Sequence, residues 1–304
     1  MHGGILHVNH IKDQIHCERA YRMGLSGKGI GVAVLDTGIF LHRDFDSRVT
    51  GFADMVNRRN FAYDDCGHGT HICGIIGGSG RMSGGRYSGI APGCDLVMVK
   101  VLDRKGNGYS SDVLAGISWI LERKEKLGIR ILNISVGACS KRGMSENSAL
   151  VKGVNRAWDA GLVVVVAAGN NGPRTMSITT PGISRKVITV GCSDDDREVL
   201  VGGNRMVDYS GRGPTAACIC KPDLVAPGCS VVSCSSRADK YTIKSGTSMS
   251  TPIVSGAVAL LLERFPDMSN KDVKLRLRES SVDIGLPRNQ QGWGLLDVGK
   301  MLER

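Results

Sequence analysis

Three polar residues that lie far apart in the sequence could carry out nucleophilic catalysis. Ser248 lies in a run of small residues just before the segment 253–262, which is apolar on nearly every side. This pattern predicts a buried helix. A hydroxyl at the amino end of such a helix meets free N–H groups and a dipole that favour a developing negative charge. Alone, Ser248 could equally be a simple helix cap, a role that serine often has.

A general base and its orienting acid are also present. His68 lies between two glycines at the start of a predicted helix, where an imidazole is accessible and free to orient. Asp36 ends a predicted buried strand, and a buried carboxylate requires a partner. His68 is the obvious one, because an aspartate that fixes the imidazole tautomer completes the arrangement of a serine nucleophile and its base. The alternatives are a structural histidine, or a metal shared with His71, for which no third ligand is evident.

The elements that must position these residues alternate along the chain. Short Val/Ile/Leu runs predict strands, and longer segments with a helical pattern predict helices. The strands are 30–35, 96–101, 129–135, 163–168 and 187–190, and the helices are 68–76, 112–126 and 148–160. Strands without polar alternation are buried on both faces. We therefore expect an α/β fold with three layers, a mostly parallel sheet flanked by helices on both faces.

Ligands of such sheets bind beyond the carboxyl ends of the strands. Asp36 follows the first predicted strand, Ser135 ends the third, and Asn170 comes just after the fourth. These three polar groups are therefore expected to converge on one edge of the sheet.

Three motifs identify a family when they are taken together. They are Asp-Thr-Gly at Asp36, His-Gly-Thr-His at His68 and Gly-Thr-Ser-Met-Ser-x-Pro around Ser248. With these motifs in this order, the chain resembles the subtilisin-like serine peptidases, the subtilase family, from about residue 27 to residue 297. The resemblance implies a serine endopeptidase with an Asp-His-Ser triad. It also implies that Asn170, within Ala-Ala-Gly-Asn-Asn-Gly, donates to the reaction's oxyanion together with the Ser248 backbone N–H.

The same resemblance implies where an extended peptide substrate binds. Two segments match those that pair with the substrate backbone in the family, and they consist of Gly106, Asn107 and Gly108, and of Ser135, Val136 and Gly137. Glycine suits such close approach of main chains. Thr179 falls near the floor of the primary pocket, which suggests a moderately sized apolar side chain before the cut. Asn171 is uncharged, so no acidic group is evident there to demand a basic residue.

The resemblance also predicts the domain organisation. We expect an N-terminal arm over residues 1–26, loosely ordered and carrying four histidines, followed by the peptidase domain over 27–304. Many subtilases carry a pro-domain before the catalytic unit; because Asp36 comes so early, we expect none here unless it was removed ahead of this sequence. Calcium is not supported at the Gly77–Ser88 loop, which contains no Asp, Glu or Asn. Calcium elsewhere is left open, no residue is assigned as a metal ligand, and no organic cofactor is required.

Composition excludes several other classes. Hydrophobic residues make up 41% and charged residues 22% of the 304 residues, as in an ordinary globular protein. No apolar run is long enough for a membrane span, and the N-terminus shows no secretory signal, so a cytoplasmic location is expected. The net charge is +10, but most lysines and arginines are interleaved with acidic residues, so we expect no nucleic-acid or membrane partner. The ten cysteines are scattered and are expected to be reduced, and Cys218 and Cys220 lack the second pair of a zinc site.

Three functions fit these features. The first is a general endopeptidase that acts on peptide or protein substrates. The second is a dedicated peptidase that processes one leader peptide or precursor. The third is a catalytically silent peptide-binding homologue, which would have no need of Asp36, His68, Ser248 and Asn170 together.

Overall fold

A seven-stranded parallel sheet forms the centre of the molecule. The computed structural model describes residues 8–137 and 146–303. The strand order is β2-β3-β1-β4-β5-β6-β9, and every neighbouring pair is parallel. The strands are β1 (Gly31–Asp36), β2 (Val49–Asp54), β3 (Asp95–Lys100), β4 (Ile129–Ile134), β5 (Val163–Ala167), β6 (Ile188–Cys192) and β9 (Leu224–Ala226).

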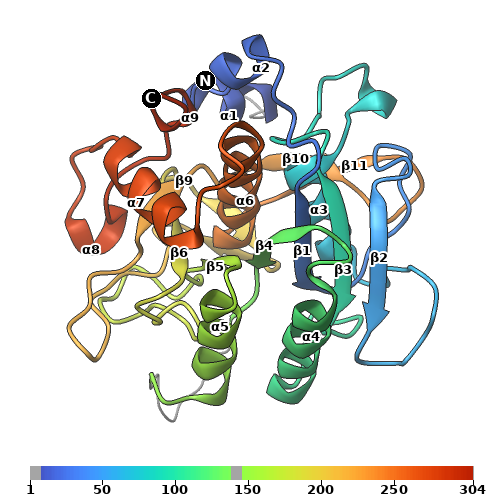
Figure 1. Cartoon of the computed structure of the whole chain (residues 1–304). Helices are drawn as coiled ribbons and strands as arrows, with labels where there is room; N and C mark the ends of the chain where they lie inside the picture. Colours follow the sequence, from blue (N-terminus) through green and yellow to red (C-terminus); the bar gives the residue numbers. More distant parts are fainter. Residues whose placement is uncertain (1–7, 138–145, 304) are drawn as a thin grey trace.

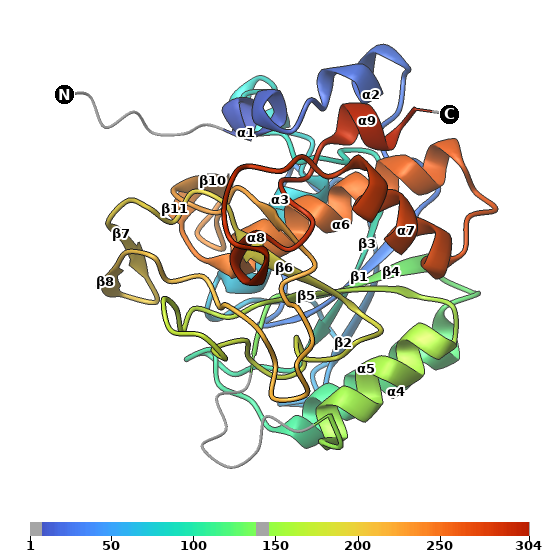
Figure 2. The same ribbon diagram turned by 90° about the vertical axis from the view of Figure 1, so that its left-hand side faces the viewer.

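Helices cover both faces of this sheet (Figures 1 and 2). Helices α3 (His68–Gly77) and α6 (Thr247–Arg264) pack on one face, and α4 (Ser110–Arg123) and α5 (Ala149–Asp159) pack together on the other. The three-layer α/β fold expected from the sequence is therefore confirmed.

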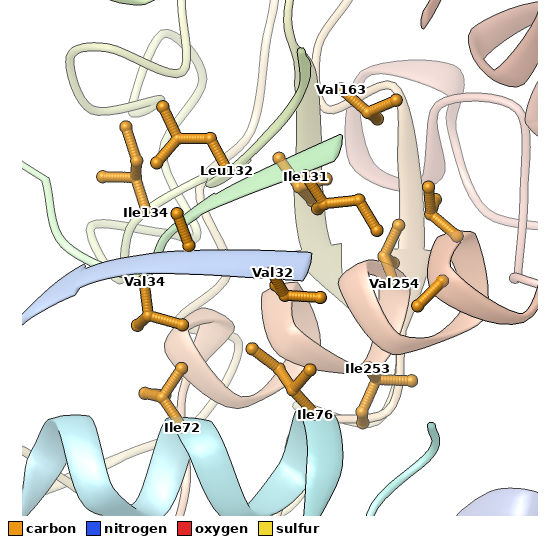
Figure 3. Close-up of a cluster of buried hydrophobic side chains, with 14 of the residues drawn as sticks. Val32, Val34, Ile72, Ile76, Ile131, Leu132, Ile134, Val163, Ile253 and Val254 are labelled. Atoms are coloured by element: carbon orange, nitrogen blue, oxygen red, sulfur yellow. The ribbon is translucent and has the colours of Figure 1, made fainter. Parts of the chain in front are cut away.

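The hydrophobic core between the sheet and the helices α3 and α6 explains why their sequences are apolar. Val32 and Val34 of β1 face Ile72 and Ile76 of α3, and Ile253 of α6 lies beside them (Figure 3). All five side chains are fully buried. From Ile253 to Leu262 every residue of α6 is buried, as its all-round apolar sequence predicted. The helix that carries Ser248 is thus a rigid part of the core.

Smaller elements surround the sheet. They are the 3₁₀ turn Arg81–Ser83, the hairpins β7 (Val199–Val201) with β8 (Asn204–Met206) and β10 (Val231–Cys234) with β11 (Tyr241–Lys244), and the helices α7 (Asn270–Ser280), α8 (Arg288–Gln291) and α9 (Val298–Met301). None of the helices within the described ranges is both long and apolar enough to cross a membrane.

The described part of the N-terminal segment is folded, so the expectation of a loosely ordered arm is wrong for residues 8–22. Helices α1 (Val8–Gln14) and α2 (Glu18–Arg22) bury Ile11 and Ile15 completely. The Ile15 carbonyl oxygen accepts a hydrogen bond from the Val298 N–H at 2.8 Å, which joins this segment to α9. Apolar contacts thus order a segment whose composition alone did not predict packing. The domain boundary at residue 26 stays a prediction.

The bounds of the five predicted strands and three predicted helices lie within one or two residues of the observed ones, apart from the C-terminal end of α4, which differs by three. Two sheet strands were not predicted. The edge strand β2 has the sequence VTGFAD, whose mixed pattern lacks a continuous apolar run, and β9 has only three residues.

Candidate active site

Asp36 occupies the carboxyl end of the central strand β1 and is fully buried. Its carboxylate accepts the Thr37 backbone N–H at 2.7 Å. Its two oxygens lie 2.8 and 3.0 Å from Nδ1 of His68. The imidazole is therefore the partner that compensates for burying this charge.

A second aspartate, Asp64, holds the first turn of α3 in place. One oxygen accepts the Thr37 hydroxyl at 2.9 Å and the Gly67 N–H at 2.7 Å. The other accepts the Thr70 N–H at 2.9 Å. Asp64 therefore joins the end of β1 to the start of α3, the two elements that carry Asp36 and His68. The sequence reasoning did not single out Asp64, although it stands four residues before His68.

The pKa of His68 reflects competing influences. Burial alone would lower the pKa of the imidazole, but the charge and hydrogen bond of Asp36 outweigh burial, so the pKa is raised above its ordinary 6.5. The Lys244 ammonium, on β11, opposes this increase. Nε2 is then the ring nitrogen left to exchange a proton with another group, since Nδ1 faces Asp36.

His71 has a structural role instead. It is fully buried, and its Nε2 lies 3.1 Å from the Val231 carbonyl oxygen and 3.2 Å from that of Thr242. Burial lowers its pKa to about 3, so the ring is neutral and its Nε2–H donates to these carbonyls. Among the described residues, no group of three His, Cys, Asp or Glu side chains close enough to hold a metal includes His68 or His71, so a metal shared by these two histidines is not supported.

Ser248 is the second residue of α6 and lines the same cavity as His68, a hollow of about 490 Å³ that we call the active-site hollow. Its hydroxyl donates to the Ser135 carbonyl oxygen at 2.7 Å. The Ser248 hydroxyl must therefore give up this hydrogen bond before it can donate to His68. The preceding Gly246 has φ +136°, and a Cβ there would come within 3.3 Å of the Asn170 amide nitrogen.

Asn170 also lines the active-site hollow, and Thr247 fixes its side chain. The Asn170 Oδ1 atom accepts both the backbone N–H and the hydroxyl of Thr247, each at 3.0 Å. The Thr247 hydroxyl in turn accepts the Gly169 N–H at 3.2 Å. Since the carbonyl end of the amide is occupied in this way, its NH₂ end is the one that can donate to a bound group.

The proposed substrate segments border two adjoining cavities. Gly106, Ser135, Val136, Gly137 and Thr179 all line the active-site hollow. Gly106, Asn107, Gly108, Val136 and Gly137 line a second cavity of about 210 Å³, together with apolar residues that the sequence reasoning missed. These are Leu102, Tyr109, Val113, Ile134 and Leu150. All seven predicted substrate-binding residues therefore border one or both of these cavities, which we call the groove and which share the lining residues Leu102, Gly106, Val136 and Gly137.

Thr179 lies buried between two glycines of this groove. A Cβ at Gly137 would come within 2.3 Å of its hydroxyl oxygen, and one at Gly169 within 2.5 Å. The Thr179 hydroxyl donates to the Ala168 carbonyl oxygen at 3.3 Å. The two walls can approach each other only because both positions are glycine.

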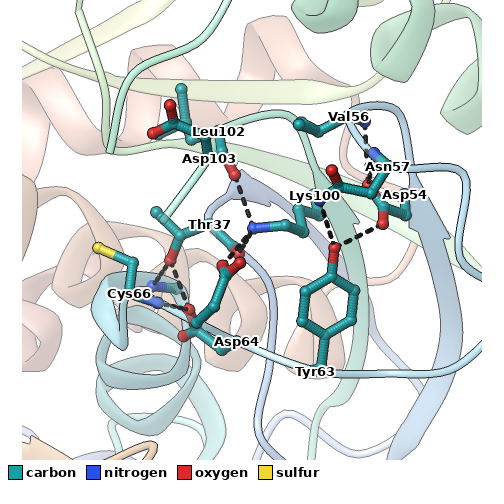
Figure 4. A network of polar contacts seen from close by, with 12 residues as sticks. Thr37, Asp54, Val56, Asn57, Tyr63, Asp64, Cys66, Lys100, Leu102 and Asp103 are labelled. Carbon is teal, nitrogen blue, oxygen red and sulfur yellow. Dashed lines mark hydrogen bonds and ion pairs between the residues drawn. The ribbon is translucent and has the colours of Figure 1, made fainter. Parts of the chain in front are cut away.

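A fully buried lysine, Lys100, is hydrogen-bonded to the segments next to the site (Figure 4). The Nζ atom of Lys100, at the end of β3, donates to the Thr37 carbonyl at 2.6 Å, the Leu102 carbonyl at 2.8 Å and the Asp65 carboxylate at 2.7 Å. Lys100 is the register partner of Asp36 in the sheet. One cation therefore joins the segment that follows Asp36, the segment that follows β3 and the loop that leads to His68. The sequence signal was a lysine that ends an otherwise apolar strand.

Comparison with known proteins shows the family. Residues 27–294 match the subtilase family, Peptidase S8. The serine protease AprX of Bacillus subtilis (strain 168) is 41% identical in an alignment of 285 positions, which covers 88% of this chain and 64% of that protein. Subtilisin DY of Bacillus licheniformis is 32% identical, with 93% of this chain and 94% of that protein covered.

Solved structures agree with this assignment. Sphericase superposes with a TM-score of 0.77 and 32% identity, over 90% of this chain and 93% of that one. A cold-adapted subtilisin-like serine proteinase gives a TM-score of 0.73 and 28% identity, with 90% of each chain covered. The chain belongs to the subtilase family. It spans 64% of the length of AprX, less than two thirds of that relative.

The charge of Lys244 should set the pH at which His68 titrates. The Lys244 charge disfavours protonation of His68. Because Lys244→Met removes this charge, the pKa of His68 is expected to rise further. Proton NMR of the His68 ring as a function of pH measures this shift. Lys240→Met, an exposed lysine just before the same strand, is the control. An unchanged or lowered pKa in Lys244→Met would contradict the electrostatic account.

Lys100 should be needed for a stable site. Lys100→Met leaves two buried carbonyl groups without their donor, so the free energy of unfolding is expected to fall by about 1–3 kcal/mol for each group left unsatisfied. Guanidinium titration measures this loss, with the exposed Lys126→Met as the control. If both variants are as stable as the parent, the supporting role of Lys100 is wrong.

Proposed function

We propose that this chain is a serine endopeptidase that hydrolyses peptide bonds in extended peptide or protein segments. The observation that carries the proposal is the hydrogen-bonded Asp36–His68 pair, whose histidine borders the same hollow as Ser248 and Asn170. Membership of the subtilase family, and relatives named as serine protease and subtilisin, support it.

In the proposed mechanism, substrate binding frees the nucleophile. The Ser135 carbonyl oxygen, which now accepts the Ser248 hydroxyl, is a natural acceptor for a backbone N–H of a peptide laid along residues 135–137. When the peptide takes this acceptor, the Ser248 hydroxyl can turn toward Nε2 of His68. His68 then removes the proton as Ser248 attacks the scissile carbonyl, and later gives it to the leaving amine.

Asn170 and the backbone N–H of Ser248 are proposed to stabilise the oxyanion that forms on attack. The Thr247 contacts support this role, because they hold the Asn170 amide in one orientation before any charge develops. Loss of one such donor typically costs about 10²–10³-fold in turnover.

Substrate choice is proposed to come from the two cavities of the groove. The second cavity is lined mostly by apolar side chains and does not include Ser248 or His68. It therefore favours an apolar substrate residue that is not adjacent to the cleaved bond. Thr179 limits the primary pocket and favours a moderately sized apolar side chain. Backbone pairing along glycine-containing segments supports broad rather than single-site specificity, since it does not depend on the side chains of the substrate.

A cytoplasmic location remains a proposal. It is supported by the cysteines, since all nine within the described ranges are unpaired, and disulfides are rare in reducing compartments.

A serine-directed fluorophosphonate probe tests the nucleophile. The wild-type chain is expected to be labelled, and Ser248→Ala is expected not to be. Asp36→Asn should lose about 10⁴-fold in turnover while it stays folded, because the histidine would be held in the wrong tautomer. Labelling that persists in Ser248→Ala but disappears in Cys66→Ala would mean that the thiol bordering the hollow is the nucleophile instead.

A diverse peptide library separates broad from dedicated activity. We expect cleavage at many unrelated sequences, with a preference for moderately sized apolar residues before the cut. Cleavage products identified by mass spectrometry give the profile. Cleavage of one preferred sequence only would favour the alternative, a peptidase dedicated to a single leader peptide or precursor. A labelled but inactive chain would indicate that turnover requires something beyond this sequence.

A further inference from the structure

Two thiols, a carboxylate and a phenol meet near the amino end of α6, at residues that do not line the active-site hollow. Cys192 ends β6, Asp194 follows it, and Cys229 follows β9. The Cys192 Sγ atom lies 3.1 Å from the Asp194 Oδ1 atom. The Tyr209 hydroxyl lies 3.2 Å from the Cys192 sulfur and 3.1 Å from the Cys229 sulfur. Both cysteines and Tyr209 are buried.

The spacing of these groups suits a small cation. Ligand atoms of Cys192, Asp194 and Cys229 all lie within 4.8 Å of one another. Zinc–sulfur bonds of about 2.3 Å in a tetrahedral site place ligand atoms roughly 4 Å apart. Small side-chain adjustments would therefore bring the three groups to one ion.

One oxygen of the Asp194 carboxylate has no hydrogen-bond donor among the described residues. Its Oδ1 atom accepts the Gly228 N–H at 2.7 Å and the Cys229 N–H at 3.1 Å, in addition to the Cys192 thiol. Its Oδ2 atom is buried and has no hydrogen-bond partner among the described residues. A buried carboxylate oxygen without a partner is costly, and a cation would remove that cost.

An acidic cavity leads to this carboxylate. A cavity of about 470 Å³ is bordered by Asp194 and by three further aspartates, Asp195, Asp196 and Asp208. Aspartates around one opening raise the local concentration of cations. The cavity therefore provides an entry path for an ion, a requirement of any metal site.

A comparable cluster elsewhere lacks these features. His42, Asp44 and Cys234 also lie close together. There the Asp44 carboxylate is saturated, since Oδ1 accepts the Met82 N–H at 2.9 Å and Oδ2 accepts the Tyr241 hydroxyl at 2.7 Å. A cation would have to displace these donors, so the cluster is better explained as structural.

We propose that Cys192, Asp194 and Cys229 bind a thiophilic divalent cation of the Zn²⁺ or Cd²⁺ class, with the Tyr209 hydroxyl beside it. Sulfur ligands favour such ions over calcium, which requires oxygen.

The site is coupled through backbone hydrogen bonds to the segment that precedes Ser248. The Gly228 carbonyl oxygen accepts the Gly246 N–H at 3.0 Å, and the Ser230 N–H donates to the Ser245 hydroxyl at 2.9 Å. An ion held by Cys229 would therefore stabilise residues 228–230, which are hydrogen-bonded to Ser245 and Gly246 just before α6. Thermal stability should rise with metal concentration, because the ion binds the folded chain.

Titration with Cd²⁺ under reducing conditions tests the proposal, in a background that carries Ser248→Ala to prevent self-cleavage and Cys218→Ala and Cys220→Ala to remove two exposed thiols. We expect one Cd²⁺ per chain and an ultraviolet thiolate-to-cadmium absorption band. The band should be lost in Cys192→Ala and in Cys229→Ala, and kept in Cys94→Ala, a matched change of another buried cysteine. Near-ultraviolet circular dichroism verifies that each variant is folded.

Asp194→Asn provides a second variant that keeps an acceptor for the two backbone N–H groups. It should weaken Cd²⁺ binding by at least about tenfold, since even the loss of an outer-shell partner costs about 10–100-fold. Three outcomes would overturn the proposal. They are no band in the parent chain, an equal band in both cysteine variants, or mass-spectrometric detection of a disulfide that joins Cys192 and Cys229 in the isolated protein.

Discussion

The hydrogen bond between the buried Asp36 carboxylate and the His68 imidazole is the interaction on which the site depends. A charge without solvent at the end of the central strand is tolerated only because a partner faces it. The surrounding polar groups keep that partner in place. Asp64 ties the start of α3 to Thr37, and Lys100 ties Thr37 to the segment after β3 and to the loop before His68. Much of this network therefore serves to keep two side chains at hydrogen-bonding distance.

The nucleophile side is built on a different principle, which is rigidity through burial. Helix α6 is apolar almost throughout and fills the space beside the sheet, so its first turn has little freedom to move. Gly246 and Gly137 remove side chains where the main chain must come close to Asn170 and Thr179. The proposed reaction then needs only a rotation of the Ser248 hydroxyl, because the elements around it are already positioned.

Local patterns predicted the central part of the fold and the three motif residues, since buried parallel strands are continuous apolar runs and the motifs are contiguous. Contacts between distant segments could not be predicted in the same way. Lys100 is visible as a lysine in an apolar strand, but its acceptor on Thr37 lies 63 positions away. The second cavity forms only where Tyr109 and Leu150, which lie far apart in the sequence, line the same space. The proposed cation site likewise forms only where Cys192 and Cys229 come close together. Such pairs depend on strand order, which one sequence does not specify.

The most direct test of this account is the tautomer of His68 in the free protein, measured by ¹⁵N NMR of histidine-labelled chain above the pKa of the ring, with His68→Ala to assign the signals. A carboxylate facing Nδ1 predicts that the neutral ring carries its proton on Nδ1, which leaves Nε2 unprotonated to act as the base. A neutral ring protonated on Nε2, or a rapid mixture of both forms, would contradict the claim that Asp36 orients this histidine.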